Sequence, residues 1–101
     1  MKLFIDDIRP IPEGWIGARN IGDAAFFMRN QTFTAISFDN DMGEEKEGAD
    51  LANWLEQKLA TGEFSKERFK NCVFTVHSSN PAACVRIEQA LVKIRELIQT
   101  P

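Results

Sequence analysis

The stretch Phe33-Thr34-Ala35-Ile36-Ser37-Phe38-Asp39-Asn40-Asp41 passes from apolar to acidic residues in a single step. A short, nearly continuous apolar run of this kind is typical of a buried strand in a parallel sheet. The N-terminal stretch Lys2–Asp7 shows the same change, from Leu-Phe-Ile to Asp-Asp. A third apolar run, Cys72–Val76, ends at the polar residues His77–Ser79. The sequence therefore predicts three buried strands whose carboxyl ends each open onto polar residues.

The region between the first two of these strands predicts a connector, a weak strand and a helix. The connector Arg9–Gly14 contains two prolines and a glycine, so it cannot be helical. Trp15–Arg19 has the composition of a weak strand. Asn20 is then placed to cap a helix over about Ile21–Arg29, and Asp23 favours the N-terminus of that helix. Because residues 24–28 of this helix are all apolar, we expect it to be largely buried.

Two further helices are predicted from apolar residues at helical spacing. One follows the acidic stretch and ends near Thr61-Gly62. The other begins with Asn80 as N-cap and Pro81 as the first helical residue. The spaced residues are Leu51, Trp54, Leu55 and Leu59 in the first helix and Cys84, Ile87, Leu91, Ile94 and Ile98 in the second. Strands that alternate with helices predict an α/β fold with a parallel sheet.

Length and composition are those of one small domain, residues 1–101. The chain is 44% hydrophobic and 27% charged. No stretch has the roughly 20 apolar residues of a membrane span, and the N-terminus turns acidic where a signal peptide is still apolar. Cys72 and Cys84 lack zinc-site spacing and lie among apolar residues, which indicates small buried side chains in a reducing compartment. We therefore expect a cytoplasmic protein that does not bind membranes.

Acidic residues are concentrated in one stretch of the chain. Between Asp39 and Asp50, six acids accompany a single base, Lys46. The bases of the C-terminal third are scattered, so the chain lacks the basic stripe that duplex DNA or RNA binding needs. The acidic stretch is either a solvated loop or a face that engages a basic partner protein.

The carboxyl ends of the strands are the predicted functional site, because ligands of open parallel sheets bind there. The strands bring Asp6 and Asp7, Asp39 and Asp41, and His77 to this edge. Carboxylates within about 4–6 Å of one another repel, so the arrangement favours a bound cation. Mg²⁺ prefers one or two carboxylates with waters and a phosphate oxygen, which also indicates a phosphorylated ligand. The alternative is that Asp6 and Asp7 only end a strand in a turn.

Polar residues near His77 predict a phosphate site. Ser78, Ser79 and Asn80 precede a helix N-terminus, whose free N–H groups attract anions. Ser78 and Ser79 alternatively only cap that helix. Arg9 is placed either to hold a phosphate bidentately or to pair with Asp7. An imidazole titrates near neutrality, so His77 is a candidate for proton transfer, although a lone histidine is often structural.

The chain resembles the receiver domains of bacterial response regulators, which have a three-layer flavodoxin-like fold of strand order 2-1-3-4-5. Phe4–Asp7 resembles the acidic pair after the first receiver strand. Ile36–Met42 resembles the phosphoacceptor segment, with Asp39 at the phosphorylated position and Asp41 where a metal-binding backbone carbonyl lies. The first helix is replaced by the connector, and the fifth strand with its lysine has no counterpart. The resemblance therefore implies a four-stranded parallel sheet of order 2-1-3-4 that lacks the first helix and fifth strand.

A closer resemblance, over nearly the whole chain, is to the cyclic-phosphate-processing receiver domain family. The motifs that carry it are Leu3–Trp15, Ser37–Gly43 and Val76–Pro81. This resemblance implies metal-dependent processing of a cyclic phosphate, on a nucleotide or at an RNA end. The site residues that it transfers to this chain are Asp6, Asp7, Asp39, Asp41, His77, Ser78 and Asn80, with Arg9 as an addition.

We accordingly expect a small phosphoesterase with Mg²⁺ or Mn²⁺ as cofactor. The strand-end carboxylates would hold the ion, which polarises the phosphoryl group or activates a water. Protonated His77 would donate to the departing oxygen, while Ser78 and the helix N-terminus hold the phosphate. Asp39 is either a ligand only or a nucleophile that forms a transient aspartyl phosphate. The alternatives are a non-catalytic receiver phosphorylated at Asp39 and an adaptor that binds through the acidic stretch.

Overall fold

A computed structural model of the chain describes residues 1–43, 47–78 and 81–100. Within these residues, four parallel strands form one sheet in the order β2-β1-β3-β4. The strands are β1 (Lys2–Ile5), β2 (Ile16–Ala18), β3 (Ala35–Phe38) and β4 (Val73–Val76). The predicted strands, their parallel direction and the order 2-1-3-4 are confirmed, and so is the α/β fold class.

The helices follow the predicted order. They are α1 (Ile21–Asn30), α2 (Gly48–Ala60) and α3 (Pro81–Gln99), with a short 3₁₀ helix at Lys66–Phe69 that the sequence analysis did not predict. The side chain of Asn20 accepts a hydrogen bond from the backbone N–H of Asp23 at 2.7 Å, as expected of an N-cap. The predicted cap of α3, Asn80, lies outside the described residues.

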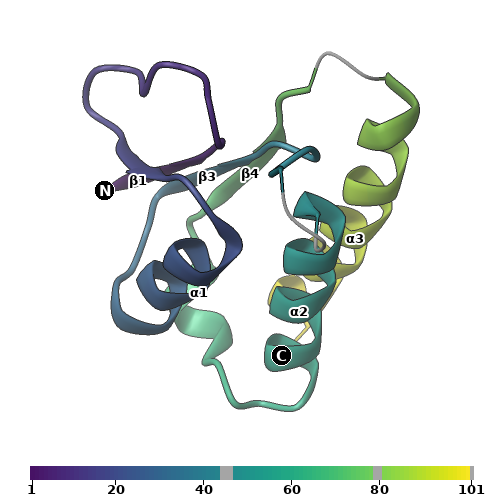
Figure 1. Ribbon diagram of the computed structural model, residues 1–101. Coiled ribbons are helices and arrows are strands. Elements are labelled where there is room, and N and C mark those ends of the chain that lie inside the picture. The colour runs from purple at the N-terminus through teal and green to yellow at the C-terminus, as the bar shows by residue number, and fades with distance from the viewer. Residues whose placement is uncertain (44–46, 79–80, 101) are drawn as a thin grey trace.

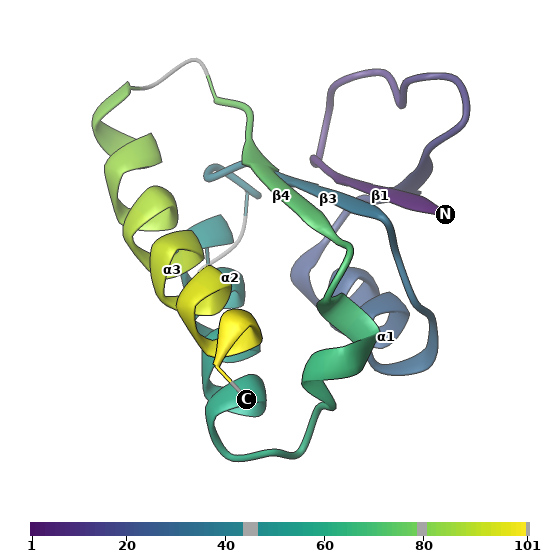
Figure 2. The same ribbon diagram turned by 180° about the vertical axis from the view of Figure 1, so that it is seen from behind.

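The three α-helices all lie against one face of the sheet (Figure 1), and the reverse view shows the same layering (Figure 2). Leu3, Ile36 and Phe74 are in register on neighbouring strands and are buried in the core. Side chains alternate along a strand, so the next positions point to the second face. There Thr75 is exposed, and Val73 is 61% exposed. The expected third layer therefore contains no helix among the described residues.

The connector between β1 and β2 covers part of the second face of the sheet. A Cβ on Gly17 would overlap the side chain of Ile11, so the absent side chain at position 17 admits the connector onto the sheet. Trp15 meets the ring of Phe4 edge-on, with 5.9 Å between centroids. Arg19 fixes the connector by donating from Nη1 to the backbone oxygen of Arg9 at 2.6 Å. These contacts allow a parallel crossover without a helix, as the prolines of this segment required.

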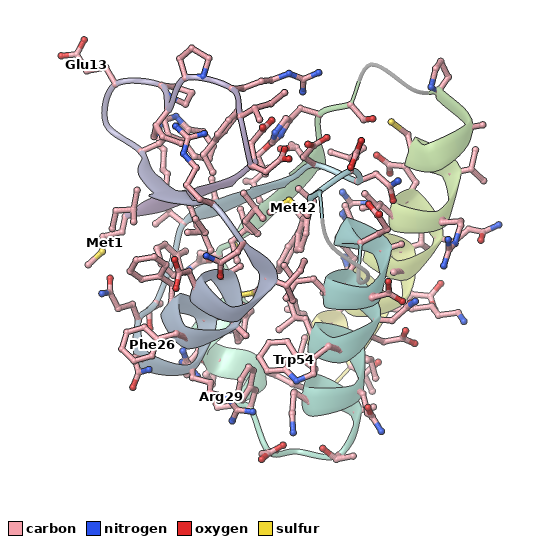
Figure 3. All side chains as sticks on the ribbon, in the orientation of Figure 1. Met1, Glu13, Phe26, Arg29, Met42 and Trp54 are labelled. Atoms are coloured by element: carbon pink, nitrogen blue, oxygen red, sulfur yellow. The ribbon has the colours of Figure 1, made fainter. Side chains whose placement is uncertain are left out.

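Burial differs from the expectation in α1 and at the cysteines. Only Ala24 and Met28 of α1 are buried, and Phe26 is 61% exposed on the outer side of the helix (Figure 3). Consecutive apolar residues point to all sides of a helix, and only one stripe faces the sheet. Cys72 and Cys84 are free thiols that are half-buried rather than fully buried. Among the described residues, no helix is long and apolar enough to cross a lipid bilayer.

Candidate functional site

Asp6, Asp39 and His77 each occupy the first position after a strand. The backbone N–H of Asp6 donates to Ala18 at 3.1 Å, that of Asp39 to Ile5 at 3.0 Å and that of His77 to Phe38 at 2.8 Å. Each residue thus continues the ladder of its strand onto the neighbouring strand. The sheet itself therefore fixes the relative positions of the three side chains.

The structure brings these three side chains into one cluster. A ligand atom from each of Asp6, Asp39 and His77 lies within 4.8 Å of the others. Asp6 is fully buried, Asp39 is 7% exposed, and His77 is half-buried. Residues that are far apart in the sequence therefore form a single polar site at the carboxyl edge of the sheet.

The carboxylate of Asp6 is surrounded by hydrogen-bond donors. Its Oδ1 accepts the backbone N–H groups of Ile8 at 3.0 Å and Arg9 at 2.9 Å. Its Oδ2 lies 3.0 Å from His77 Nε2 and 3.5 Å from Arg9 Nη1. Burial alone would raise the pKa of Asp6, but the hydrogen bonds from Arg9, Ile8 and His77 outweigh it and hold the pKa below its usual value. Asp6 is therefore ionised at neutral pH.

Asp39 behaves in the opposite way. Burial and the nearby charge of Asp6 raise its pKa to about 6, and the charge of Asp7 adds to this effect. Arg9 only partly offsets the increase. Asp39 is thus a carboxyl group whose proton is exchanged near neutral pH.

His77 is held on three sides. Its ring stacks on Phe4 with 4.2 Å between centroids and 8° between planes. Nδ1 lies 2.6 Å from Ser37 Oγ, and Nε2 is bonded to Asp6. Burial lowers the pKa of His77, while the hydrogen bond and the charge of Asp6 oppose the decrease. The expected proton transfer from His77 to a ligand would therefore require Nε2 to leave Asp6.

The loop after β3 is anchored to the start of α2. The N–H of Gly48 donates to the carbonyl of Asn40 at 2.8 Å, and a Cβ at Gly48 would overlap the backbone oxygen of Asp39. Met42, labelled in Figure 3, is 2% exposed and places the loop against the core. A glycine is thus required at position 48 for Asp39 to keep its place.

Asp7 and Asp41, the other predicted metal ligands, do not join the cluster of described residues. Asp41 is exposed, and its Oδ1 accepts the N–H of Gly43 at 3.0 Å. Gly43 has a positive φ of 66°, and a Cβ there would lie 3.0 Å from Asp7 Oδ2. This turn directs the Asp41 carboxylate toward its own loop. Asp7 is half-buried and acts on the site through its charge.

The predicted phosphate-binding residues are only partly described. Arg9 pairs with Asp6 rather than with Asp7, the partner that we considered, and its side chain is 40% exposed. Ser78 is half-buried next to His77 and makes contacts of its own. Ser79 and Asn80 lie outside the described residues, so their assignment stays a prediction.

The acidic stretch is not simply a charged surface. Asp39 is buried in the site, and the N–H of Glu47 donates to Asp50 Oδ2 at 2.8 Å in the first turn of α2. Carboxylates at a helix N-terminus stabilise the helix. Glu44, Glu45 and Lys46 lie outside the described residues, so the docking role of this stretch stays a prediction.

The chemistry of the donor set fits a hard divalent cation. Asp6 is ionised, and among the described residues its Oδ2 has one close hydrogen-bond partner, His77. Asp39 is destabilised in its charged form by Asp6, and a cation between the two carboxylates would remove that repulsion. Oxygen ligands of this kind suit Mg²⁺ or Mn²⁺.

A parallel sheet of order 2-1-3-4, with acidic residues after its two central strands, defines a receiver-like α/β domain. The family model of the cyclic-phosphate processing receiver domain matches residues 1–93. The chain therefore belongs to the cyclic-phosphate processing receiver domain family, as its motifs predicted. No curated protein and no solved structure matches the chain.

Proposed function

We propose that this domain is a divalent-cation-dependent phosphoesterase that acts on a cyclic phosphate, carried by a nucleotide or by an RNA end. The observation that carries the proposal is the cluster of Asp6, Asp39 and His77, in which burial and the charge of Asp6 raise the pKa of Asp39 to about 6. Membership of the family associates the domain with cyclic-phosphate processing and supports this class of ligand.

Asp6 and Asp39 are the residues that would hold Mg²⁺ or Mn²⁺. Asp6 is already ionised and its carboxylate is fixed by the backbone of residues 8 and 9, so it needs no rearrangement. Asp39 has to lose its proton before it can bind, and for that reason binding is expected to weaken below about pH 6. A bound divalent ion supplies Lewis-acid polarisation of a phosphoryl oxygen.

Arg9 is placed to bind the phosphate. Its backbone is fixed at both ends of the residue, because its N–H donates to Asp6 and its carbonyl accepts from Arg19. Its guanidinium is only 3.5 Å from Asp6 Oδ2 and remains partly exposed. Once a cation neutralises Asp6, the guanidinium is available to a phosphate, which it can bind bidentately.

Two residues of the cluster are assigned roles in the chemistry. Asp39 exchanges a proton near neutrality when no cation is bound, and as a carboxylate it is either a ligand or a nucleophile toward phosphorus. His77 carries a proton on Nε2 toward Asp6, and a leaving oxygen would have to replace Asp6 as its acceptor. Both groups belong to the same cluster, so a phosphate bound there would contact them together.

The test uses the purified protein with Mg²⁺ or Mn²⁺ and a panel of 2′,3′-cyclic nucleotides, 3′,5′-cyclic nucleotides and RNA that ends in a cyclic phosphate. We expect turnover of at least one of these compounds. Asp39→Asn is expected to lower kcat/KM at least about 100-fold, which corresponds to about 2.7 kcal/mol. Glu88→Gln, an exposed charge change on α3, serves as the control and is expected to keep wild-type activity. Absence of turnover of every cyclic phosphate by the folded wild type would contradict the proposal.

A second candidate function is phosphorylation of Asp39 in a non-catalytic receiver. The observation in its favour is that Asp39 directly follows β3, at the position of the receiver phosphoacceptor. Incubation with acetyl phosphate and Mg²⁺, followed by intact mass spectrometry, separates the two functions. A stable adduct of one phosphoryl group, absent in Asp39→Asn, would favour the receiver.

A further inference from the structure

We propose that Ser37 is a positioning residue, which holds the ring of His77 and through it the carboxylate of Asp6. Ser37 opens the Ser37–Gly43 motif, but the motif by itself assigned no role to this serine. Its effect on cation binding rests on the proposed function, whereas its hydrogen bond to His77 does not.

Ser37 lies inside β3, and its hydroxyl points to the second face of the sheet. It is in register with Phe4 on β1 and with Thr75 on β4. It is 6% exposed, whereas Thr75, beside it on the same face, is exposed. Its Oγ lies 2.6 Å from His77 Nδ1, the shorter of the two hydrogen bonds to this imidazole. A buried hydroxyl in a sheet needs a partner, and the imidazole provides it.

The contacts of His77 restrain different movements of the ring. Stacking on Phe4 fixes the plane of the imidazole. The bonds from Nδ1 to Ser37 and from Nε2 to Asp6 fix its rotation within that plane. A ring flip would place carbon atoms opposite both oxygen partners. The three contacts together allow one orientation of the imidazole.

The directions of the hydrogen bonds follow from the chemistry of the partners. The ionised carboxylate of Asp6 can only accept, so Nε2 must carry a hydrogen. In the neutral imidazole, Nδ1 is then an acceptor, and the Ser37 hydroxyl donates to it. The hydroxyl can also turn and accept from Nδ1–H, so it remains a partner of the ring in either protonation state. Ser37 therefore holds the His77 ring beside Asp6 in both protonation states of the imidazole.

Loss of the hydroxyl is expected to release the ring from one side. Residues that orient metal-binding side chains typically change metal affinity by 10- to 100-fold when they are removed. Because His77 stands between Ser37 and the carboxylate, we expect the lower end of this range, about 10-fold weaker binding of Mn²⁺ in Ser37→Ala. Phe4 still stacks on the ring and retains part of the orientation.

The test compares Ser37→Ala with Thr75→Ala. Thr75 carries a hydroxyl at the register position next to Ser37, on the same face, but is exposed. The ¹⁵N signals of the imidazole report the hydrogen bond directly, and the chain has only one histidine to assign. In the metal-free protein, the ¹⁵N chemical shift of Nδ1 should move in Ser37→Ala toward that of an unprotonated nitrogen that accepts no hydrogen bond. It should stay unchanged in Thr75→Ala. Mn²⁺ titration should show the 10-fold loss in the first variant only.

Ser37→Thr separates positioning from packing, because it keeps the hydroxyl. It should return the Nδ1 signal and the Mn²⁺ affinity toward wild type, with thermal melting used to establish that each variant folds. An Nδ1 signal that does not move in folded Ser37→Ala would overturn the proposal. A wild type that binds no Mn²⁺ would overturn the proposed function and leave the nitrogen signals as the test of Ser37.

Discussion

The loops that follow β1 and β3 each begin with an aspartate, Asp6 and Asp39, at equivalent positions on neighbouring strands. The pKa of Asp6 is nevertheless lowered and that of Asp39 is raised. The loop after β1 turns two backbone N–H groups back onto Asp6, and His77 and Arg9 add to them. The loop after β3 gives Asp39 a backbone hydrogen bond from Asn40 and then leads to the start of α2. Burial raises the pKa of both carboxyl groups, but only Asp6 receives enough donors to reverse the effect.

The difference shows how a fold can prepare a cation site. If hydrogen-bond donors fully stabilised the charges of both carboxylates, the pair would gain little electrostatic energy from binding a divalent ion. Two buried carboxylates without hydrogen-bond donors would destabilise the fold strongly. Here Asp6 is fixed and ionised, whereas the raised pKa of Asp39 shows that its charged form is disfavoured, and a cation would stabilise that form. Removal of either member of this pair should therefore have opposite consequences for stability.

Asp6→Ala should give the largest effect, a loss of about 3 kcal/mol in the free energy of unfolding at pH 7, because the partly buried donors of residues 8, 9 and 77 lose their acceptor. Asp41→Ala, which removes an exposed carboxylate with one backbone bond, is the matched control and should cost less than about 1 kcal/mol. The lowered pKa of Asp6 means that its contribution is present above its unfolded pKa of about 4 and is lost as the pH falls through the folded value. Urea denaturation from pH 7 to pH 2 measures this, and equal losses in both variants would contradict the account.

Asp39→Asn should stabilise the metal-free protein at pH 7.5. Because the folded pKa is raised, the contribution of Asp39 to stability is present below about pH 4 and is lost as the pH rises through about 6. The pKa of Asp39 is about 4 in the unfolded chain and about 6 in the folded protein, so the gain is no more than about 3 kcal/mol. Thermal melting should show a higher Tm for the variant than for the wild type at pH 7.5. At pH 4 the two proteins should have the same Tm. A variant that is less stable than wild type at pH 7.5 would show that the ionised carboxylate is not crowded.

Arg9→Gln should have the smallest effect, and its sign is informative. The guanidinium lowers the pKa of Asp39 and lies beside Asp6 Oδ2, so it competes with an incoming cation. We expect its removal to strengthen Mg²⁺ or Mn²⁺ binding by about 3-fold, equivalent to roughly 0.7 kcal/mol. Lys93→Gln on the exposed side of α3 removes one positive charge at a distance and should change the affinity little. Isothermal titration calorimetry measures the affinity for the cation. Weaker cation binding in Arg9→Gln would show that Arg9 does not compete with the cation.

Most of the fold could be predicted because its signals are local. The apolar runs that end at Ile5, Phe38 and Val76 give the strands, and Asn20 marks the start of α1 because its side chain accepts a hydrogen bond from the backbone N–H of Asp23. The family resemblance supplied the strand order. Among the described residues no helix covers the second face of the sheet, and Phe26 is exposed. Both features depend on which face of an element packs against another element, and neither the periodicity of α1 nor its composition contains that information.

The candidate site could be predicted only as far as its residues follow strand ends. Asp6, Asp39 and His77 were found in this way, because parallel strands place their carboxyl ends at one edge. Ser37 was not, since its role depends on its register with Phe4 and on a histidine 40 positions later. Asp41 was predicted as a further metal ligand; its carboxylate accepts the N–H of Gly43 within its own loop, and its role as a ligand stays a prediction.

The most direct measurement is an NMR titration of the Asp39 side-chain carboxyl carbon, with and without Mg²⁺. The account predicts an apparent pKa of about 6 in the metal-free protein, while the pKa of Asp6 stays below its usual value. It also predicts that Mg²⁺ lowers the apparent pKa of Asp39, because the ion binds only the ionised form. An Asp39 carboxyl that titrates near pH 4 and ignores Mg²⁺ would contradict the central claim.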